Sequence, residues 1–100
     1  MENKYKNIII YLSPELSQKI LSCEINCFEY KTIPRHVIDG QKWYIHEKFQ
    51  AKKIVGYFTV TRIIEKCIFF EKVIRFDTPV KNPEKHLCMS FRYISEDIKG

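Results

Sequence analysis

Residues 7–21 read NIIIYLSPELSQKIL, and this stretch decides the fold because it predicts a strand followed directly by a helix. Its first six residues form a short apolar run rich in β-branched side chains, which favours a buried strand. Ser13 can cap a helix, Pro14 fits the first helical position, and Glu15 suits the positive end of the helix dipole. We expect this helix to end near Ser22.

The rest of the chain predicts strands separated by turns and loops. The expected strands are residues 27–33, 42–47, 53–66, 67–76 and 90–94, with a turn at 71–72 as an alternative that would split the fourth. Asp39-Gly40 is a turn signal, and Gly56 within a strand predicts a bulge or bend. We expect residues 77–86 to form a loop and residues 95–100 a polar tail.

These elements predict one α+β domain spanning residues 1–100. Several of the strands are too hydrophobic to be exposed on either face, which favours a curled or closed sheet over a flat one. The expected fold is therefore a small barrel of about six strands, with one helix after the first strand plugging one side.

Composition favours a compact globular chain with a moderate preference for anionic partners. The 100 residues are 45% hydrophobic, and 17 Lys and Arg against 12 Asp and Glu give a net charge of +5. Such an excess attracts polyanions, although it also serves ordinary solvation. The N-terminus MENKYKN is too polar for a secretory signal and no apolar run approaches a membrane span, so we expect a cytoplasmic protein that does not enter membranes.

The cysteines do not suggest a metal site. One pair has Cys-x-x-x-Cys spacing and the other two are scattered, whereas zinc sites use two close ligand pairs. The residues concerned are Cys23, Cys27, Cys67 and Cys88, with His46 and His86 as the other conceivable ligands. We expect reduced thiols, no metal and no cofactor.

Several stretches in order resemble the ASCH domains of the PUA-like superfamily. The helix segment SPELSQKIL followed by FEYK resembles the start of these domains, and WYIHEKFQAKKIVG and KIVGYFTV resemble their central strands. LCMSFRYI resembles the segment that closes many members. The resemblance implies a PUA-like β-barrel with a cleft near the helix, associated with RNA or modified nucleobases. Some members are amidohydrolases that act on acetylated cytidine, with a Lys and a Glu as the catalytic candidates.

The sequence departs from this pattern where the family places its pocket. Cys23 stands where the family has a glycine at the helix end, so another residue such as Asn26 is expected to take the positive φ. Ile25 replaces the pocket lysine and can be neither nucleophile nor cation. Glu29 matches the family's Glu, but Lys31 replaces an Arg and loses the bidentate fork. The family's long helical insert before the closing strand is also nearly absent.

Candidate binding residues nevertheless gather in this region. Glu29 and Lys31 would contact a base edge or a phosphate, unless they form only a surface charge pair. Trp43 and Tyr44 point to opposite sides of a strand, so one is expected in the core and the other on the surface, where it could stack on a base. The remaining candidates, which contact phosphate or are simply solvated, are Arg35, His36, Lys42, Lys53 and Arg62.

Three functions follow from these observations. The leading hypothesis is a non-catalytic module that binds RNA or a nucleotide. The second is a small effector that binds a protein partner, such as a nuclease of a host defence system. Its many Lys, Ile, Asn and Phe residues are typical of proteins from low-GC genomes, which fits a phage or mobile element. The third is an N4-acetylcytidine amidohydrolase in which Lys31 and Glu29 or Glu65 form the acting pair.

Overall fold

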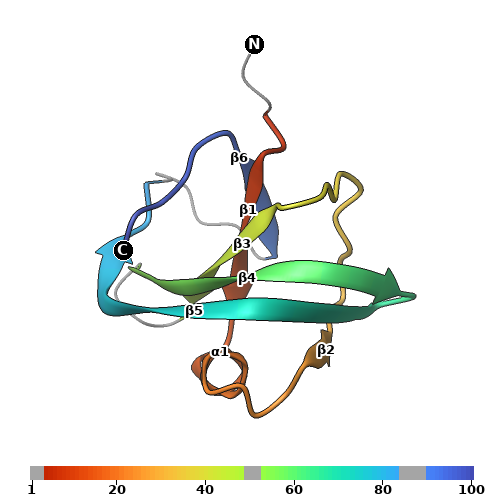
Figure 1. Ribbon diagram of the computed structural model, residues 1–100, viewed down its shortest axis with the longest axis horizontal. Coiled ribbons are helices and arrows are strands. Elements are labelled where there is room, and N and C mark those ends of the chain that lie inside the picture. Colours follow the sequence, from red (N-terminus) through yellow and green to blue (C-terminus); the bar gives the residue numbers. More distant parts are fainter. Residues whose placement is uncertain (1–3, 49–52, 84–89) are drawn as a thin grey trace.

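The computed structural model describes residues 4–48, 53–83 and 90–100, and these contain one helix and six strands (Figure 1). In chain order the elements are β1 (Asn7–Leu12), α1 (Pro14–Leu21), β2 (Cys27–Glu29), β3 (Lys42–Glu47), β4 (Lys53–Ile64), β5 (Cys67–Lys81) and β6 (Phe91–Ile94). No helix in these ranges is long and apolar enough to cross a membrane.

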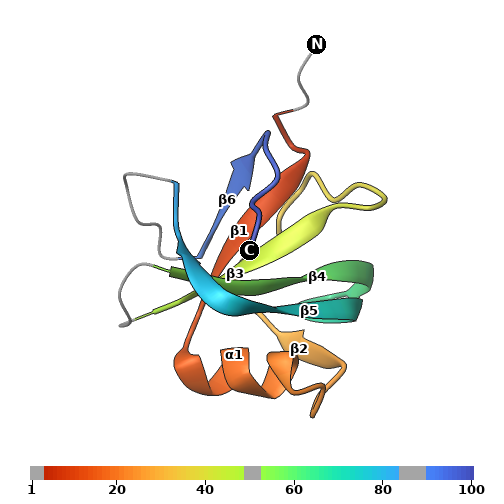
Figure 2. The ribbon, with the colours of Figure 1, turned by 60° about the vertical axis from the view of Figure 1, so that its left-hand side comes forward.

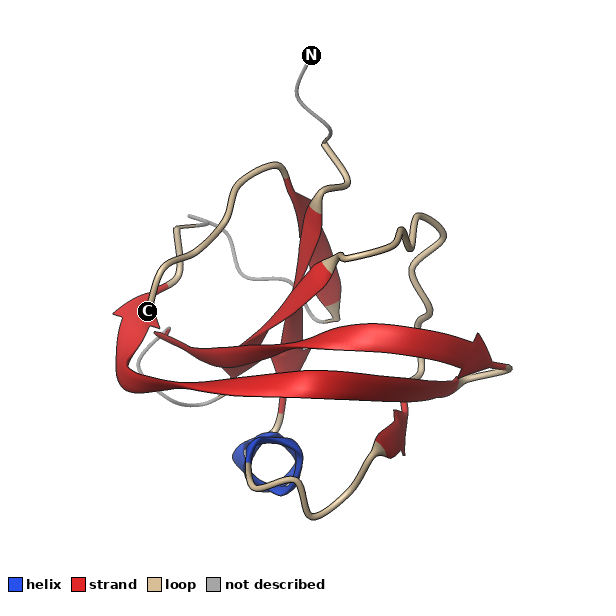
Figure 3. Cartoon of the chain, in the orientation of Figure 1, coloured by secondary structure: helices blue, strands red, loops and turns tan. Residues whose placement is uncertain are grey.

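The strands form a single curled sheet in the order β2-β5-β4-β3-β1-β6. β1 runs parallel to β3, and the other neighbouring pairs are antiparallel. Figures 2 and 3 show the strong twist of this sheet, with α1 beneath the long β4–β5 hairpin. The predicted α+β fold, a curled sheet of six strands with one helix, is confirmed.

Both faces of the central strands are buried, and each face carries its own core. On the helix side, Ile8 and Ile10 of β1 pack with Trp43 and Phe58. On the other side, Ile9 and Tyr11 pack with Tyr44, Ile54 and Ile94. A strand buried on both faces needs apolar residues at consecutive positions, which explains the uninterrupted run at the start of the chain.

The ends of α1 are stabilised by local hydrogen bonds. The Ser13 side chain accepts a hydrogen bond from the backbone N–H of Leu16 at 3.3 Å. At the C-terminal end, Cys23 takes a φ of +59°, its N–H donates to the Ile20 carbonyl, and the Glu24 N–H donates to the Lys19 carbonyl. This is the Schellman arrangement. The prediction that Asn26 takes the positive φ is wrong, because Cys23 itself adopts the left-handed conformation.

Gly56 marks a bulge in β4, as the sequence predicts. The pairing register of β4 with β5 shifts between Ile54 and Gly56. A Cβ on Gly56 would overlap the Ile74 carbonyl oxygen and come within 2.8 Å of Leu21 Cδ2. The absence of a side chain therefore lets β5 and the end of α1 approach the backbone of β4.

Two predicted boundaries are wrong. The strand expected over residues 27–33 stops at Glu29. The strand expected to end at residue 76 continues to Lys81, because Lys72 absorbs an irregularity with a φ of +53° and the chain stays extended. Residues 77–81 are therefore strand rather than loop, and residues 84–86 of the expected loop lie outside the described residues.

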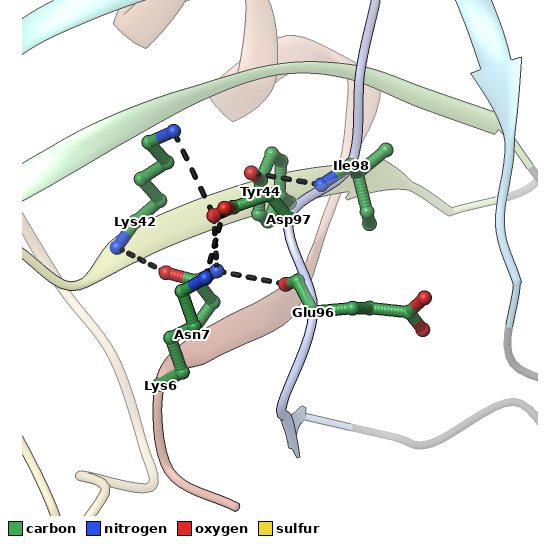
Figure 4. A network of polar contacts seen from close by, with 7 residues as sticks. All are labelled: Lys6, Asn7, Lys42, Tyr44, Glu96, Asp97 and Ile98. Atoms are coloured by element: carbon green, nitrogen blue, oxygen red, sulfur yellow. Dashed lines mark hydrogen bonds and ion pairs between the residues drawn. The ribbon is translucent and has the colours of Figure 1, made fainter. Parts of the chain in front are cut away.

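The C-terminal tail is docked on the sheet rather than being only polar surface (Figure 4). Asp97 accepts hydrogen bonds from Lys6 and from the Asn7 side chain, both at 2.9 Å. Both contacts lower the pKa of the Asp97 carboxyl, and the hydrogen bond from Lys6 has the larger effect. The Ile98 N–H donates to the Tyr44 hydroxyl at 2.9 Å. Ile98 also packs against the core on the face of the sheet away from α1.

His46 is buried in a polar cluster on the same side as the tail. The amide nitrogen of Asn82 lies 2.9 Å from His46 Nδ1 and 3.2 Å from the Tyr11 hydroxyl. Because an amide nitrogen only donates, Nδ1 accepts and the proton of the neutral ring is on Nε2. Burial lowers the pKa of His46 below its usual 6.5.

Replacing Gly56 by Ala should lower the free energy of unfolding by about 1–3 kcal/mol, because the new methyl group meets backbone that cannot move independently. Urea denaturation measures the effect. Thr61→Ala, at an exposed position of the same strand, is the control and should change stability by less than about 0.5 kcal/mol. If Gly56→Ala is as stable as the wild type, the close approach of β4, β5 and α1 is wrong.

Stability should fall as the pH drops below about 6.5, since the unfolded chain takes up a proton at His46 before the folded chain does. The loss should be at most about 1.4 kcal/mol per pH unit, and it should end once the pH is below the pKa of the folded state. Urea denaturation between pH 7.5 and 5.5 tests this. His46→Gln should remove this part of the pH dependence, and an unchanged slope in that variant would contradict the assignment.

Candidate functional site

Trp43 is a core residue and not a stacking surface. Its side chain is fully buried, and its indole N–H donates to Gln41 Oε1 at 2.8 Å. Tyr44 on the opposite side of β3 is also fully buried. The prediction that one of these two rings is exposed is wrong, because residues of α1 and of the curled β4–β5 hairpin pack around Trp43, while Tyr57, Phe76 and the tail pack around Tyr44.

Glu29, the last residue of β2, and Lys31, two residues beyond it, line the same pocket. Both are exposed, and with Tyr30 and Lys66 they line a shallow pocket of about 250 Å³. Lys66 comes from the turn between β4 and β5, and its carbonyl accepts a hydrogen bond from the Tyr30 N–H at 2.9 Å. The lining of this pocket therefore comes both from the end of β2 and from the turn of the β4–β5 hairpin.

Tyr30 fixes the start of the following loop, residues 30–41. Its hydroxyl lies 2.9 Å from the Tyr11 carbonyl oxygen and 2.6 Å from that of Ser90. Burial raises the pKa of Tyr30 to about 12, so the hydroxyl stays protonated and can donate. One side chain thereby ties the loop to β1 and to the start of β6.

The middle of this loop carries an aromatic stack. The His36 ring lies parallel to the Tyr5 ring, with centroids 3.9 Å apart and an interplanar angle of 12°. Tyr93 meets both rings edge-on, and its hydroxyl accepts a hydrogen bond from the His36 N–H at 3.0 Å. Lys4 Nζ lies 5.1 Å from the Tyr5 ring centroid. His36 is exposed, whereas Tyr5 and Tyr93 are half-buried.

Gln41 connects the two backbone segments that carry the stacked rings of Tyr5 and His36. Its side-chain nitrogen donates to the carbonyl oxygens of Tyr5 at 2.8 Å and His36 at 2.9 Å. Its side-chain oxygen is taken by Trp43, so the amide orientation is fixed. The stack is therefore anchored to the core through the backbone on both sides.

Loop 30–41 starts at the pocket and carries His36 of the stack, and Figure 1 shows it leaving β2 and passing behind the outer end of the β4–β5 hairpin on its way to β3. Arg35 is exposed in the same loop. We name this surface the basic strip. It consists of Lys4, Tyr5, Lys31, Arg35, His36 and Lys66, with Glu29 as an acidic neighbour.

The other predicted residues lie apart from the stack. Lys42 faces a different groove, with its ammonium 3.7 Å from Asp97 and 5.2 Å from the Tyr57 ring centroid. Arg62 is exposed near the hairpin tip and covers the Phe69 ring at 4.5 Å. Lys53 lies at the opposite end of β4, paired with Lys81. Nine residues of extended strand place Lys53 about 30 Å from Arg62.

Sequence reasoning missed Tyr5 and Lys4, and it assigned Tyr93 mainly to closing the barrel. The signal for the first two was present in the stretch Lys4-Tyr5-Lys6, because an aromatic residue between basic ones is typical of nucleic-acid contacts. That such a short N-terminal segment would meet residue 36 was not predictable from local pattern.

The described residues contain no group of three or more His, Cys, Asp or Glu side chains that could hold a metal ion. Cys23 is exposed, and Cys27 and Cys67 are half-buried free thiols on neighbouring strands. Burial and the nearby Cys27 raise the pKa of the Cys67 thiol, which disfavours the reactive thiolate. Cys88 and His86 lie outside the described residues.

Comparison with solved structures identifies the architecture. A crystal structure of a serine-to-alanine mutant of ASCH from Zymomonas mobilis matches with a TM-score of 0.72 and 11% identity, over 94% of this chain and 91% of that chain. A crystal structure of ASCH from Zymomonas mobilis matches with a TM-score of 0.69 and 13% identity, over 90% and 88%. The chain has the ASCH fold. No family model matches the sequence, and comparison with curated proteins found no match.

The segment after α1 lines another concave surface. A shallow pocket of about 390 Å³ is lined by Cys23, Glu24, Ile25, Asn26 and Cys27. Ile25, at the position where the resemblance places a lysine, is half-buried and packs against the core.

The exposure of Lys31, Glu29 and Glu65 does not suit acid–base chemistry. All three side chains are exposed. A lysine that acts as a base, and a carboxyl that acts as an acid, are usually tuned by burial. These three side chains lack that burial.

Proposed function

We propose that this ASCH-fold chain is a non-catalytic module that binds single-stranded nucleic acid, RNA in the first place, along the basic strip. The observation that carries the proposal is the stack of His36 on Tyr5. Tyr5 covers one face of the imidazole, and His36 is exposed, so a base can extend the stack on the other face. Stacking of a base on an aromatic side chain contributes about 1–3 kcal/mol.

Cations on both sides of the stack support phosphate contacts. Lys4 lies beside Tyr5, and Arg35 directly precedes His36 in the loop. Lys31 and Lys66 continue the positive charge toward the hairpin tip. A nucleic acid that places one base on His36 would run its backbone along these residues, which supplies most of the affinity but little sequence selectivity.

The same geometry favours single strands over duplexes. A base can stack on a side chain only when it is not already stacked and paired within a helix. Because the stack is one ring wide and anchored by Gln41, it suits one unpaired base rather than a groove of a duplex. The net charge of +5 adds a long-range attraction that is independent of base identity.

The test is fluorescence anisotropy with labelled single-stranded RNA, its duplex and single-stranded DNA, at low and physiological salt. The double variant Lys31→Glu/Arg35→Glu should weaken binding of single-stranded RNA at least about tenfold and lower the slope of log affinity against log salt by about 1.4, from roughly 0.7 per lost phosphate contact. His36→Ala should weaken binding about fivefold to a hundredfold with the slope unchanged.

The matched control is Lys19→Glu/Lys81→Glu, which changes the net charge equally at two exposed residues on α1 and at the end of β5. This control should bind almost as well as the wild type. Equal losses in both double variants would mean that binding depends only on net charge. Unchanged binding in Lys31→Glu/Arg35→Glu would place any nucleic-acid site elsewhere.

A second candidate function, binding of a protein partner, is favoured by exposed apolar residues, three of which lie in loop 30–41 or at the end of β4. Among the described residues, the exposed large hydrophobic side chains are Val37, Ile38, Ile64 and Ile74. The first two belong to loop 30–41 and Ile64 ends β4 at the hairpin. In the anisotropy assay, Val37→Ser/Ile38→Ser should retain RNA affinity if RNA is the ligand. A wild type that binds no RNA even at low salt would leave the protein-partner function as the better candidate.

A further inference from the structure

Two free thiols lie side by side where β2 pairs with β5. Cys27 is opposite Phe69 and Cys67 is opposite Glu29 in this antiparallel ladder. Residues two apart on a strand share a face of the sheet, so the two cysteines are diagonal neighbours on one face. Their thiols hydrogen-bond to each other, and both side chains are half-buried. The two sulfur atoms are therefore already in contact in the reduced protein.

The thiol pair lies on the face of β2 that is turned away from the core. Phe28 and Ile68 alternate with the cysteines along the two strands, and both are buried in the core on the helix side. Cys27 also lines the open pocket of about 390 Å³ that follows α1. A small oxidant can therefore reach Cys27 without unfolding of the chain.

β2 has the freedom that a bond between these two residues requires. The Cα atoms of diagonal neighbours are about 7–8 Å apart in a regular ladder, whereas those of a disulfide are usually about 4.4–6.8 Å apart. β2 has three residues and lies at the edge of the sheet beside β5. A movement of this short strand toward β5 by about 1 Å brings the two residues within the range of a disulfide.

We propose that Cys27 and Cys67 form a modification site, which a small disulfide such as oxidised glutathione converts into an intramolecular disulfide bond. The Cys27 thiolate attacks one sulfur of the oxidant, and one glutathione leaves as its thiolate. The Cys67 thiolate then attacks the Cys27 sulfur and displaces the second glutathione. Two electrons pass from the protein to the oxidant, and the two thiol protons end on the two released glutathione molecules.

The closing step depends on loss of the proton from Cys67. Burial, followed by the hydrogen bond with Cys27, raises the pKa of the Cys67 thiol. The thiolate is the attacking species, so at pH values below that pKa the closing step should become about tenfold faster for each pH unit. The pair should therefore oxidise slowly at neutral pH and faster in mildly alkaline solution.

The bond would fix the two sides of the pocket that Glu29 and Lys31 line. Glu29 follows Cys27 by two residues in β2, and Lys66 directly precedes Cys67 at the hairpin turn. Because the disulfide also restricts the unfolded chain, it should raise the midpoint of thermal unfolding by at least about 5 °C. Formation of the bond does not depend on the function proposed for the basic strip.

The experiment incubates the reduced full chain with millimolar oxidised glutathione in mildly alkaline buffer and then alkylates the remaining thiols. Mass spectrometry of the intact and the trypsin-digested protein identifies the product. Trypsin leaves Cys67 in peptide 67–72 and both Cys23 and Cys27 in peptide 20–31. We expect two of the four cysteines to escape alkylation, these two peptides to be linked, and dithiothreitol to separate them again.

The matched control is Cys23→Ser, which removes an exposed thiol from the same pocket and should leave the linked peptides unchanged. Cys27→Ser should abolish both the link and the rise in the unfolding midpoint. Cys67→Ser should do the same but retain glutathione on Cys27. The proposal would be overturned by a bond between Cys23 and Cys27, a bond to Cys88, a link between two chains, a lasting glutathione adduct on the wild type, or four thiols that remain reduced.

Discussion

Burial of β1 on both faces is the constraint on which the rest of the structure depends. The strand lies between β3 and β6, and consecutive isoleucines at positions 8, 9 and 10 are completely buried in opposite directions. Each isoleucine buried in this way contributes about 1.5–3 kcal/mol. Something must cover each face, and α1 with the β4–β5 hairpin covers one while the docked tail and the end of β5 cover the other.

This two-sided burial also explains why the candidate site lies at the margin of the sheet. The central strands have no free face on which a ligand could lie, so the exposed residues that could bind one lie on the loop. Tyr30 and Gln41 lie at the two ends of loop 30–41. Their side chains bond to backbone carbonyl oxygens and so fix the position of the exposed residues between them. A rigid scaffold that positions residues on a loop is the common arrangement for binding sites.

The candidate site was only partly predictable, for reasons specific to each residue. Glu29 and Lys31 were found because adjacency in the sequence keeps them close in space. Trp43 was misassigned because an alternating pattern shows which side of a strand a residue occupies, but not whether that side is covered. Lys42 was identified as a binding residue, yet it faces Asp97 and the Tyr57 ring rather than the basic strip.

The sequence by itself determined the elements and their order, since helix caps, the apolar run of β1 and the bulge at Gly56 arise from residues close together in the chain. Only the tertiary structure decided that Tyr5 stacks on His36, that Asp97 pairs with Lys6, and that β5 extends to Lys81. Those outcomes depend on contacts between distant segments. Such contacts form only once the two cores have brought the segments together, and no local pattern encodes them.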